Sequence, residues 1–339
     1  MITTKQKFSL IYFLTNSFFL ASGYSLIFKT SGKDSWVSML IGMLIGIIFI
    51  LIINNYCFNH KKNYLLNTKQ SLINKLISLS FFFFLLFINL LILRIFVTSF
   101  LLTKTPGLFI TLPFIFLALY NSSKGVNNIA KTAEILMPIS LAIIIITILS
   151  VIKDGDINYF LPLITTKKYS LIKSSFYFSI FTVIPNSLLF DIKIDLKNHL
   201  KSYVISSLVS LFIGIFIIYV LGPYLIKVFR FPEYMVLKQI KVFNFIEKIE
   251  NLVGLIWIFN LFISASISLY NVNKIIKNNK FMIFFVVLVP FLVEFISSNY
   301  NYAISIYKNL PLLLFIIGSL FLFSLYRIMK KIKKVASAT

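Results

Sequence analysis

Residues 18–28, Phe18-Phe19-Leu20-Ala21-Ser22-Gly23-Tyr24-Ser25-Leu26-Ile27-Phe28, form an apolar run that small residues interrupt at its centre. A second apolar run, over residues 171–190, is interrupted at Thr182-Val183-Ile184-Pro185-Asn186. Pro185 has no amide hydrogen and disfavours helical geometry at the residue before it, so we expect a helix break there. From Ser22 to Pro185 is 163 residues. Helix breaks at matching positions are typical of a membrane fold made of two inverted halves.

The composition of the chain indicates a membrane protein. Hydrophobic residues make up 59% and charged residues 13% of the 339, and the mean hydropathy is +0.93. A chain with so little polar surface cannot cover a water-facing globule. Its 38 Phe and 17 Tyr are too many for a disordered or nucleic-acid-coating chain. We therefore attribute the formal net charge of +23 to contact with the lipid bilayer and expect no nucleic-acid partner.

Ten apolar runs approach the length of about 20 residues that a membrane-crossing helix needs, and the fourth of them is short. They cover roughly residues 8–28, 35–54, 77–102, 107–121, 133–152, 171–190, 203–221, 251–270, 281–298 and 310–327. We predict an all-α integral membrane protein with ten transmembrane helices in a 5+5 inverted repeat, in which helices 1 and 6 are discontinuous. The alternative is that Gly and Pro are simply common in membrane helices.

The predicted chain is a single transmembrane, permease-like domain over residues 1–339. The first repeat covers about 8–152, the second about 171–327, and a basic tail follows at 328–339. With a cytoplasmic amino terminus, the inner segments hold 19 of the 33 Lys and Arg residues and the outer segments hold 13. Cytoplasmic loops carry the excess of these residues, so we predict that both termini are cytoplasmic.

A cleaved signal peptide is an alternative interpretation of the first run. The small residues Ala21-Ser22-Gly23 follow an apolar stretch, as they do at a signal-peptidase site. The apolar run continues past them through Phe28, which favours a helix that is retained.

The residue types that commonly hold metals are few. Cys57 is the one cysteine, and the two histidines, His60 and His199, lie far apart in sequence beside lysines. They make no metal-ligand pattern and no intramolecular disulfide. We therefore predict no metal and no cofactor, and we assign no catalytic residue.

The first helix break is half of the predicted ligand site. Unwound stretches of membrane helices free backbone groups to bind a substrate near the middle of the bilayer. The amides of Ser22, Gly23 and Tyr24 stand at the positive end of a half-helix and suit a carboxylate.

The second break, at Pro185, supplies the other half. Carbonyl groups near Ile184 and the side chains of Thr182 and Asn186 suit an ammonium group or a cation. Together the two breaks predict a site shaped for an amino acid. Asn260 lies at interior depth and is a further candidate, although for it and for Asn89, Ser264 and Ser266 interhelical hydrogen bonds are the alternative.

Two ionisable residues lie well inside apolar runs. Arg94 follows Leu90-Leu91-Ile92-Leu93, and Glu294 follows Pro290-Phe291-Leu292-Val293. An unpaired charge at such a depth costs at least about 2.5 kcal/mol. We expect Arg94 to pair with Glu294 or with Glu250, either as a structural ion pair or for ligand or proton handling.

The longest outer connection, between the seventh and eighth spans, contains Phe231-Pro232-Glu233. Pro232 is placed as the first residue of an amphipathic helix, because proline suits the first helical turn. We predict that this helix is a lid over the outer mouth.

Three stretches carry a resemblance to a known family: residues 231–237, residues 245–250, which read Phe245-Ile246-Glu247-Lys248-Ile249-Glu250, and Ile256-Trp257-Ile258. They resemble the signature of the spore germination permease family, which is related to amino-acid permeases of the amino acid-polyamine-organocation superfamily. Further stretches agree, and they are residues 33–38, 102–106, 125–134 and 161–163.

The resemblance implies a B subunit of a nutrient germinant receptor in the spore inner membrane. Its implied partners are a small-molecule nutrient, an A-type membrane subunit, a lipoprotein C-type subunit and the lipid bilayer. It also implies that binding, with optional transport, is the function and that the protein is not an enzyme. The alternatives are a stand-alone amino-acid or cation symporter and a membrane glycan or acyl transferase, for which the outer loops hold few titratable residues.

Overall fold

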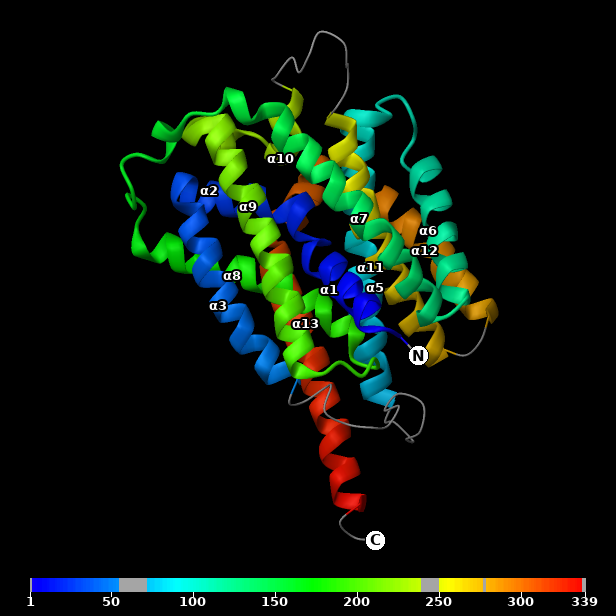
Figure 1. Cartoon of the computed structure of the whole chain (residues 1–339). Helices are drawn as coiled ribbons and strands as arrows, with labels where there is room; N and C mark the ends of the chain where they lie inside the picture. The colour runs from blue at the N-terminus through cyan, green and yellow to red at the C-terminus, as the bar shows by residue number, and fades with distance from the viewer. Residues whose placement is uncertain (1, 55–71, 239–249, 277–278, 337–339) are drawn as a thin grey trace.

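A computed structural model describes residues 2–54, 72–238, 250–276 and 279–336. Every regular element in these ranges is a helix (Figure 1). Within these ranges six helical segments are long and apolar enough to cross a membrane, and α6 and part of α12 are shorter apolar helices. The chain is therefore an all-α protein whose helices suit a bilayer.

The elements follow one another along the chain with short π and 3-10 helices at the breaks. They are α1 (Thr4–Asn16), η1 (Phe19–Gly23), α2 (Tyr24–Ser31), η2 (Gly32–Asp34), α3 (Ser35–Ile53), α5 (Leu72–Phe96), η4 (Val97–Leu101), α6 (Leu108–Ser123), α7 (Val126–Val151), η5 (Ile152–Asp154), η6 (Ile157–Phe160), α8 (Lys168–Val183), η7 (Ile184–Leu189), α9 (Leu196–Val228), α10 (Pro232–Lys238), α11 (Glu250–Ile276), α12 (Asn279–Ser298) and α13 (Tyr300–Ala336).

Each of the ten predicted runs falls on one or more of these helices. Because six segments of the described ranges meet the length and hydropathy of a membrane span, the count of ten transmembrane helices and the inverted repeat stay predictions. The seventh run was expected to end at residue 221, but α9 continues to Val228 across a kink. At the kink Gly222 has φ 74°, which glycine adopts without steric cost, and Pro223 follows it. A turn at Gly32, with φ 56°, likewise separates α2 from α3.

The faces of the helices divide between protein and lipid. In α3 the small residues Ser38, Gly42 and Gly46 are buried, whereas Leu44 and Ile48 on the other side are more than half exposed. A Cβ atom on Gly42 would overlap the backbone oxygen of Ser175 in α8. Small residues thus let α3 and α8 pack closely, which is how membrane helices gain contact without a hydrophobic driving force.

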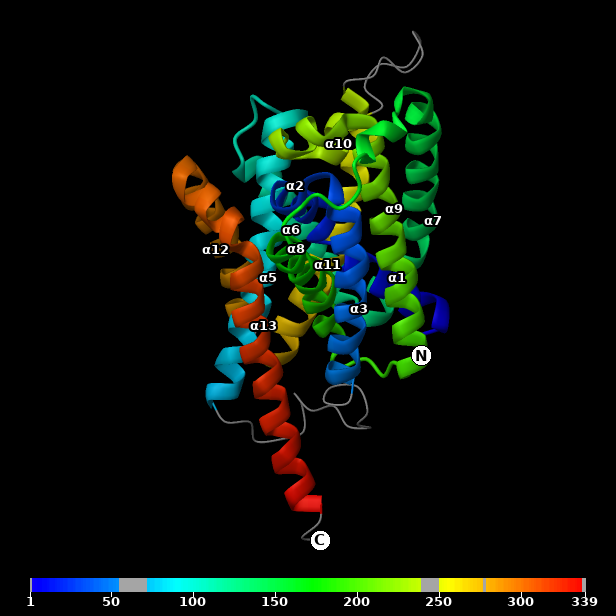
Figure 2. The same ribbon diagram turned by 90° about the vertical axis from the view of Figure 1, so that its left-hand side faces the viewer.

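The first helix lies at the centre of the bundle. Helix α1 packs against α7, α8, α9 and α11, and it also contacts η7. The start of α1 and the end of α13 lie toward the same end of the molecule, and α10 lies at the opposite end (Figures 1 and 2). Every residue of α1 from Ser9 to Asn16 is buried, and so is every residue of η7.

A buried carboxylate fastens the connection between α7 and α8 to the start of α3. Asp34 accepts hydrogen bonds from the backbone amides of Ile164, Thr165 and Thr166, at 3.1, 2.9 and 2.9 Å. The Thr166 hydroxyl also donates to it at 2.7 Å. Lys33 reinforces the same junction by donating to the carbonyl of Leu161 at 2.6 Å.

We expect Asp34→Asn to destabilise this junction, because a carboxylate that accepts several amides becomes a neutral group with one acceptor oxygen. Loss of charge-assisted hydrogen bonds of this kind costs about 2 kcal/mol, or roughly 4 °C in apparent Tm. Thermal unfolding of the purified protein in detergent measures the change. Asp154→Asn, at an exposed outer aspartate, is the matched control, and an equal Tm for both variants would contradict the expectation.

Candidate functional site

The first break is a π-helical turn between α1 and α2. Its backbone is internally bonded: the Ser22 amide donates to the Phe18 carbonyl at 3.2 Å, and the Tyr24 amide donates to the Phe19 carbonyl. The Ser22 hydroxyl donates to the same Phe18 carbonyl at 2.5 Å. A Cβ atom on Gly23 would overlap the ring of Phe19. The amides of Ser22 and Tyr24, which the sequence predicts as carboxylate donors, are thus occupied in this conformation.

The second break is the 3-10 helix η7, which begins after α8 with Pro185 in its first turn. The hydroxyl of Thr182 donates to the Phe178 carbonyl at 2.8 Å and lies 3.0 Å from the hydroxyl of Tyr203. The Ile184 carbonyl accepts from the hydroxyl of Ser187 at 2.6 Å. Two of the predicted cation ligands of this break, the Thr182 hydroxyl and the Ile184 carbonyl, are therefore also bonded within the chain.

The end of the second break is tied to α11. Asn271 donates through Nδ2 to the Leu188 carbonyl at 2.9 Å, and Lys274 forms an ion pair with Asp191. Both side chains of this pair are largely buried. Any movement of η7 relative to α11 must break these contacts.

A side-chain bridge joins the two breaks. Asn186 donates through Nδ2 to the hydroxyl of Thr15 at 3.0 Å and to the Thr182 carbonyl at 2.8 Å. Its Oδ1 is buried and has no hydrogen-bond partner among the described residues. Asn186 thus connects the end of α1 to η7 and keeps one acceptor free.

A second buried polar chain connects the first break to α9. The hydroxyl of Ser210 donates to Oδ1 of Asn16, and the Tyr24 hydroxyl donates to the Ser210 carbonyl. The side-chain Nδ2 of Asn16 donates to the Tyr12 carbonyl at 2.9 Å. The sequence analysis missed Asn16 and Ser210, although Thr15-Asn16-Ser17 is an evident polar interruption of the first apolar run.

The interior asparagines and serines have the roles expected of interhelical contacts. Asn89 of α5 donates to Ser264 of α11 at 3.1 Å, and Asn121 of α6 donates to Ser266 at 3.2 Å. Asn260 differs in that its Nδ2 donates to the Ile256 carbonyl of its own helix at 2.7 Å. The Oδ1 atoms of Asn260 and Asn89 are both buried and have no partner among the described residues. Asn260 thus keeps a free acceptor, as Asn186 does.

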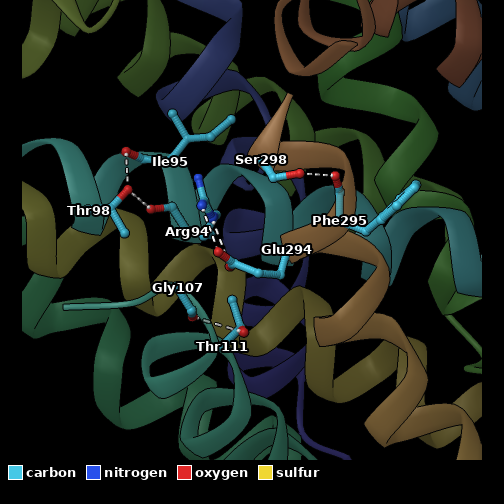
Figure 3. Close-up of polar contacts among 8 residues, drawn as sticks. All are labelled: Arg94, Ile95, Thr98, Gly107, Thr111, Glu294, Phe295 and Ser298. Atoms are coloured by element: carbon cyan, nitrogen blue, oxygen red, sulfur yellow. Dashed lines mark hydrogen bonds and ion pairs between the residues drawn. The ribbon is translucent and has the colours of Figure 1, made fainter. Parts of the chain in front are cut away.

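Arg94 pairs with Glu294, one of its two predicted partners. Two parallel bonds join them, from Nε to Oε2 at 3.1 Å and from Nη2 to Oε1 at 2.9 Å (Figure 3). Gly107, just before α6, lies against the pair, and a Cβ atom there would overlap both side chains. The pair therefore joins α5, α12 and the start of α6. The side chain of Glu250, the other predicted partner, lies outside the described residues.

The predicted lid is the helix α10, which begins at Pro232 as expected. Its apolar side chains are buried, and Phe231 packs against Trp257 with ring centroids 5.2 Å apart. Phe96, the last residue of α5, has its ring 4.2 Å from that of Trp257. The hydroxyl of Tyr234 donates to Asn251 at 3.2 Å. Helix α10 thus packs on an aromatic cluster of Phe96, Phe100, Phe231, Tyr234 and Trp257, and its role as a lid stays a prediction.

Glu233, on the same helix, is buried rather than facing water. Its residue is 6% exposed, and its Oε2 has no hydrogen-bond partner among the described residues. Burial raises the pKa of the Glu233 carboxyl well above its usual range. Arg230 lies nearby with its guanidinium 4.8 Å from the ring of Tyr307, whose hydroxyl donates to the Ser22 carbonyl at 3.4 Å. Arg230 and Tyr307 are further residues that the sequence analysis missed.

Two broken helices joined through buried polar side chains, inside a bundle of apolar helices, define a multi-pass α-helical membrane protein with discontinuous helices at its centre. A family model described as spore germination protein, that of the spore permeases, matches residues 1–303. The chain therefore belongs to the spore germination permease family. A comparison with curated proteins finds no match.

We expect Arg94→Met and Glu294→Gln each to lower the apparent Tm, because either change leaves a half-buried charge without its partner. The free energy of unfolding should fall less in the double variant than the sum of its falls in the two single variants. The difference, which is the interaction energy of the pair, should be about 1 kcal/mol or more. Thermal unfolding of the four proteins of this cycle gives the coupling. Additive losses would mean that the two charges do not support each other.

The raised pKa of Glu233 predicts a pH dependence of stability. The folded state binds the Glu233 proton more tightly than the unfolded state does. The stability that this proton adds to the folded state is therefore complete below the ordinary carboxyl pKa and is lost as pH rises through the raised pKa. Glu233→Gln, which resembles the neutral carboxyl, should remove that loss. Apparent Tm from about pH 5 to pH 9 tests this, and parallel curves for the two proteins would contradict it.

Proposed function

We propose that the protein is the nutrient-binding subunit of a spore germinant receptor, and that the bound nutrient triggers germination through partner subunits. Membership of the spore germination permease family supports a germination-related membrane permease with a small-molecule ligand. In the proposed assembly the partners are an A-type membrane subunit and a lipoprotein C-type subunit. The protein would lie in the spore inner membrane with both termini cytoplasmic, and it acts by binding rather than by catalysis.

The observation that carries the proposal is the bridge between the two helix breaks. Asn186 of η7 donates to Thr15 of α1 at 3.0 Å and keeps a buried oxygen that has no partner in the part of the chain that the structure describes. Buried polar atoms without partners are uncommon and costly, so such an atom at the meeting point of two broken helices suits a ligand donor group. An ammonium group is the donor that this acceptor and that of Asn260 favour.

The proposed mechanism is a population shift between two conformations of a ten-helix, 5+5 repeat. In the closed form the amides of Ser22 and Tyr24 bond within the chain. Rocking of one half against the other would release them, and the carboxylate of a nutrient would then replace the Phe18 and Phe19 carbonyls as acceptor. The ligand stabilises the form in which these donors are free, because only that form binds it.

Two substitutions at the first break test this site. Ser22→Trp and Gly23→Val add bulk where a Cβ atom on Gly23 already overlaps Phe19, so both should abolish nutrient-triggered germination. We expect a loss of at least about tenfold in germination rate, corresponding to about 1.4 kcal/mol of lost binding. The measurement is the fall in optical density of spores after addition of nutrient.

Ser123→Trp is the matched control, because Ser123 is an exposed serine at the end of α6. It should germinate at the wild-type rate. Immunoblots of spore membranes must show equal amounts of all variants. Normal germination by Ser22→Trp and Gly23→Val at normal protein levels would show that the nutrient does not bind at this break.

A further inference from the structure

A small, partly open cavity lies beneath α10, apart from the bridge between the two breaks. Its volume is about 40 Å3, and η1, α7, α9, α10 and α11 contribute its walls. Apart from Thr147 and Glu233, the lining side chains are hydrocarbon or aromatic, and they include Leu20, Phe216 and Trp257. The hydroxyl of Thr147 donates to the Ile143 carbonyl of its own helix at 2.7 Å. Glu233 is therefore the one ionisable group in this lining.

The carboxylate of Glu233 has no neutralising partner within the described part of the chain. Its Oε2 accepts no hydrogen bond, and no ion pair joins it to Arg230. The Arg230 guanidinium lies instead over the rings of Tyr307 and Phe231, at 4.8 and 5.6 Å. Tyr24 of α2 and Tyr307 of α13 are the titratable groups that interact with Glu233 electrostatically, and α7, α9 and α11 present uncharged side chains to the cavity.

The residues that line the cavity indicate which class of ligand could bind beside the buried carboxyl group of Glu233. A hard metal ion needs about six oxygen ligands, whereas this cavity offers the two of Glu233 and that of Thr147. A neutral apolar ligand would leave the carboxylate unpaired. An organic ammonium ion donates hydrogen bonds to the carboxylate, gains cation–π attraction from aromatic rings and places its alkyl part on apolar walls.

We propose that this cavity is a binding site for the ammonium group of a small organic amine, with Glu233 as its counter-ion. One water needs roughly 10–15 Å3 of such space, so about 40 Å3 admits an ammonium group with one or two carbon atoms. The argument for this site does not rest on the ligand site proposed at the helix breaks, although Leu20 of η1, in the first break, lines the cavity. Its ammonium group comes either from a separate amine or from the amino group of the nutrient.

Binding at this site also concerns the position of α10. Glu233 lies two residues from Phe231, which packs on Trp257, so the bound ammonium group and the aromatic cluster hold the same helix. When the ammonium ion enters, the neutral carboxyl of Glu233 releases its proton to solvent and the carboxylate accepts N–H hydrogen bonds from the ligand. Burial disfavours the ionised carboxyl of Glu233 when the cavity is empty. The hydrogen bonds and the positive charge of the bound ammonium group offset this cost.

The two tryptophans of the chain allow a direct test with methylammonium as the probe. Trp36→Phe leaves Trp257, in the cavity wall, as the one tryptophan. In the full-length protein in detergent, methylammonium chloride should change the Trp257 fluorescence saturably, whereas sodium chloride at equal ionic strength should not. Adding Glu233→Gln should weaken binding at least about tenfold, because it removes the buried charge partner.

The matched control is Asp154→Asn, which removes an exposed outer carboxylate and should leave methylammonium affinity unchanged. At pH values below the raised pKa of Glu233, the affinity for methylammonium should rise by up to about tenfold for each unit by which the pH increases. This pH dependence should vanish in Glu233→Gln. Equal affinity of wild type and Glu233→Gln, or the absence of a saturable change, would overturn the proposal, and it would leave the site at the helix breaks untouched.

Competition identifies the source of the ammonium group. If an amino acid that triggers germination displaces methylammonium, the cavity takes the amino group of the nutrient. If it does not, while methylammonium still requires Glu233, the cavity serves a separate amine. Both results support the site.

Discussion

The need to satisfy every backbone polar group inside hydrocarbon governs this structure. No water is present in the bilayer core, so an interrupted membrane helix must bond its amides and carbonyls within the protein. At the first break a π turn and the hydroxyl of Ser22 meet this need, and at the second a 3-10 turn and Asn271 do so. The backbone groups described at the two breaks are consequently hydrogen-bonded within the protein in this conformation. A ligand that binds the amides of Ser22 and Tyr24 must replace the carbonyls that accept from them.

Two regions of the molecule contain buried side-chain oxygens that could accept a hydrogen bond from a ligand. At the centre, Asn186 and Asn260 keep buried oxygens without partners among the described residues. Beneath α10, Glu233 keeps a buried carboxylate oxygen in the same state. All three favour a donor or a cation, whereas the amides of the first break favour an anion once released. Under the proposed function, this distribution would suit a ligand that carries both kinds of group.

Much of the fold could be read from the chain because apolar length and helix-breaking residues act locally. The run over 171–190 with Pro185, and the start of α10 at Pro232, lie where the sequence indicates. The pairing of buried groups was less predictable. Arg94 had two candidate acids and pairs with Glu294 of α12, although α11, which begins at Glu250, also packs against α5. Asn16 and Ser210 are 194 residues apart, and no periodicity relates them.

The sequence by itself determined that the chain is a bundle of membrane helices, that two of these helices are interrupted, and that Arg94 and Glu294 need partners. Hydropathy, helix length and proline geometry decide these features residue by residue. The tertiary structure alone decided which buried group meets which, that the amides of Ser22 and Tyr24 are occupied, and that Glu233 faces a cavity instead of water. These features depend on how α1, η7, α10 and α11 pack, because hydrogen bonds and burial are set by neighbours distant in sequence.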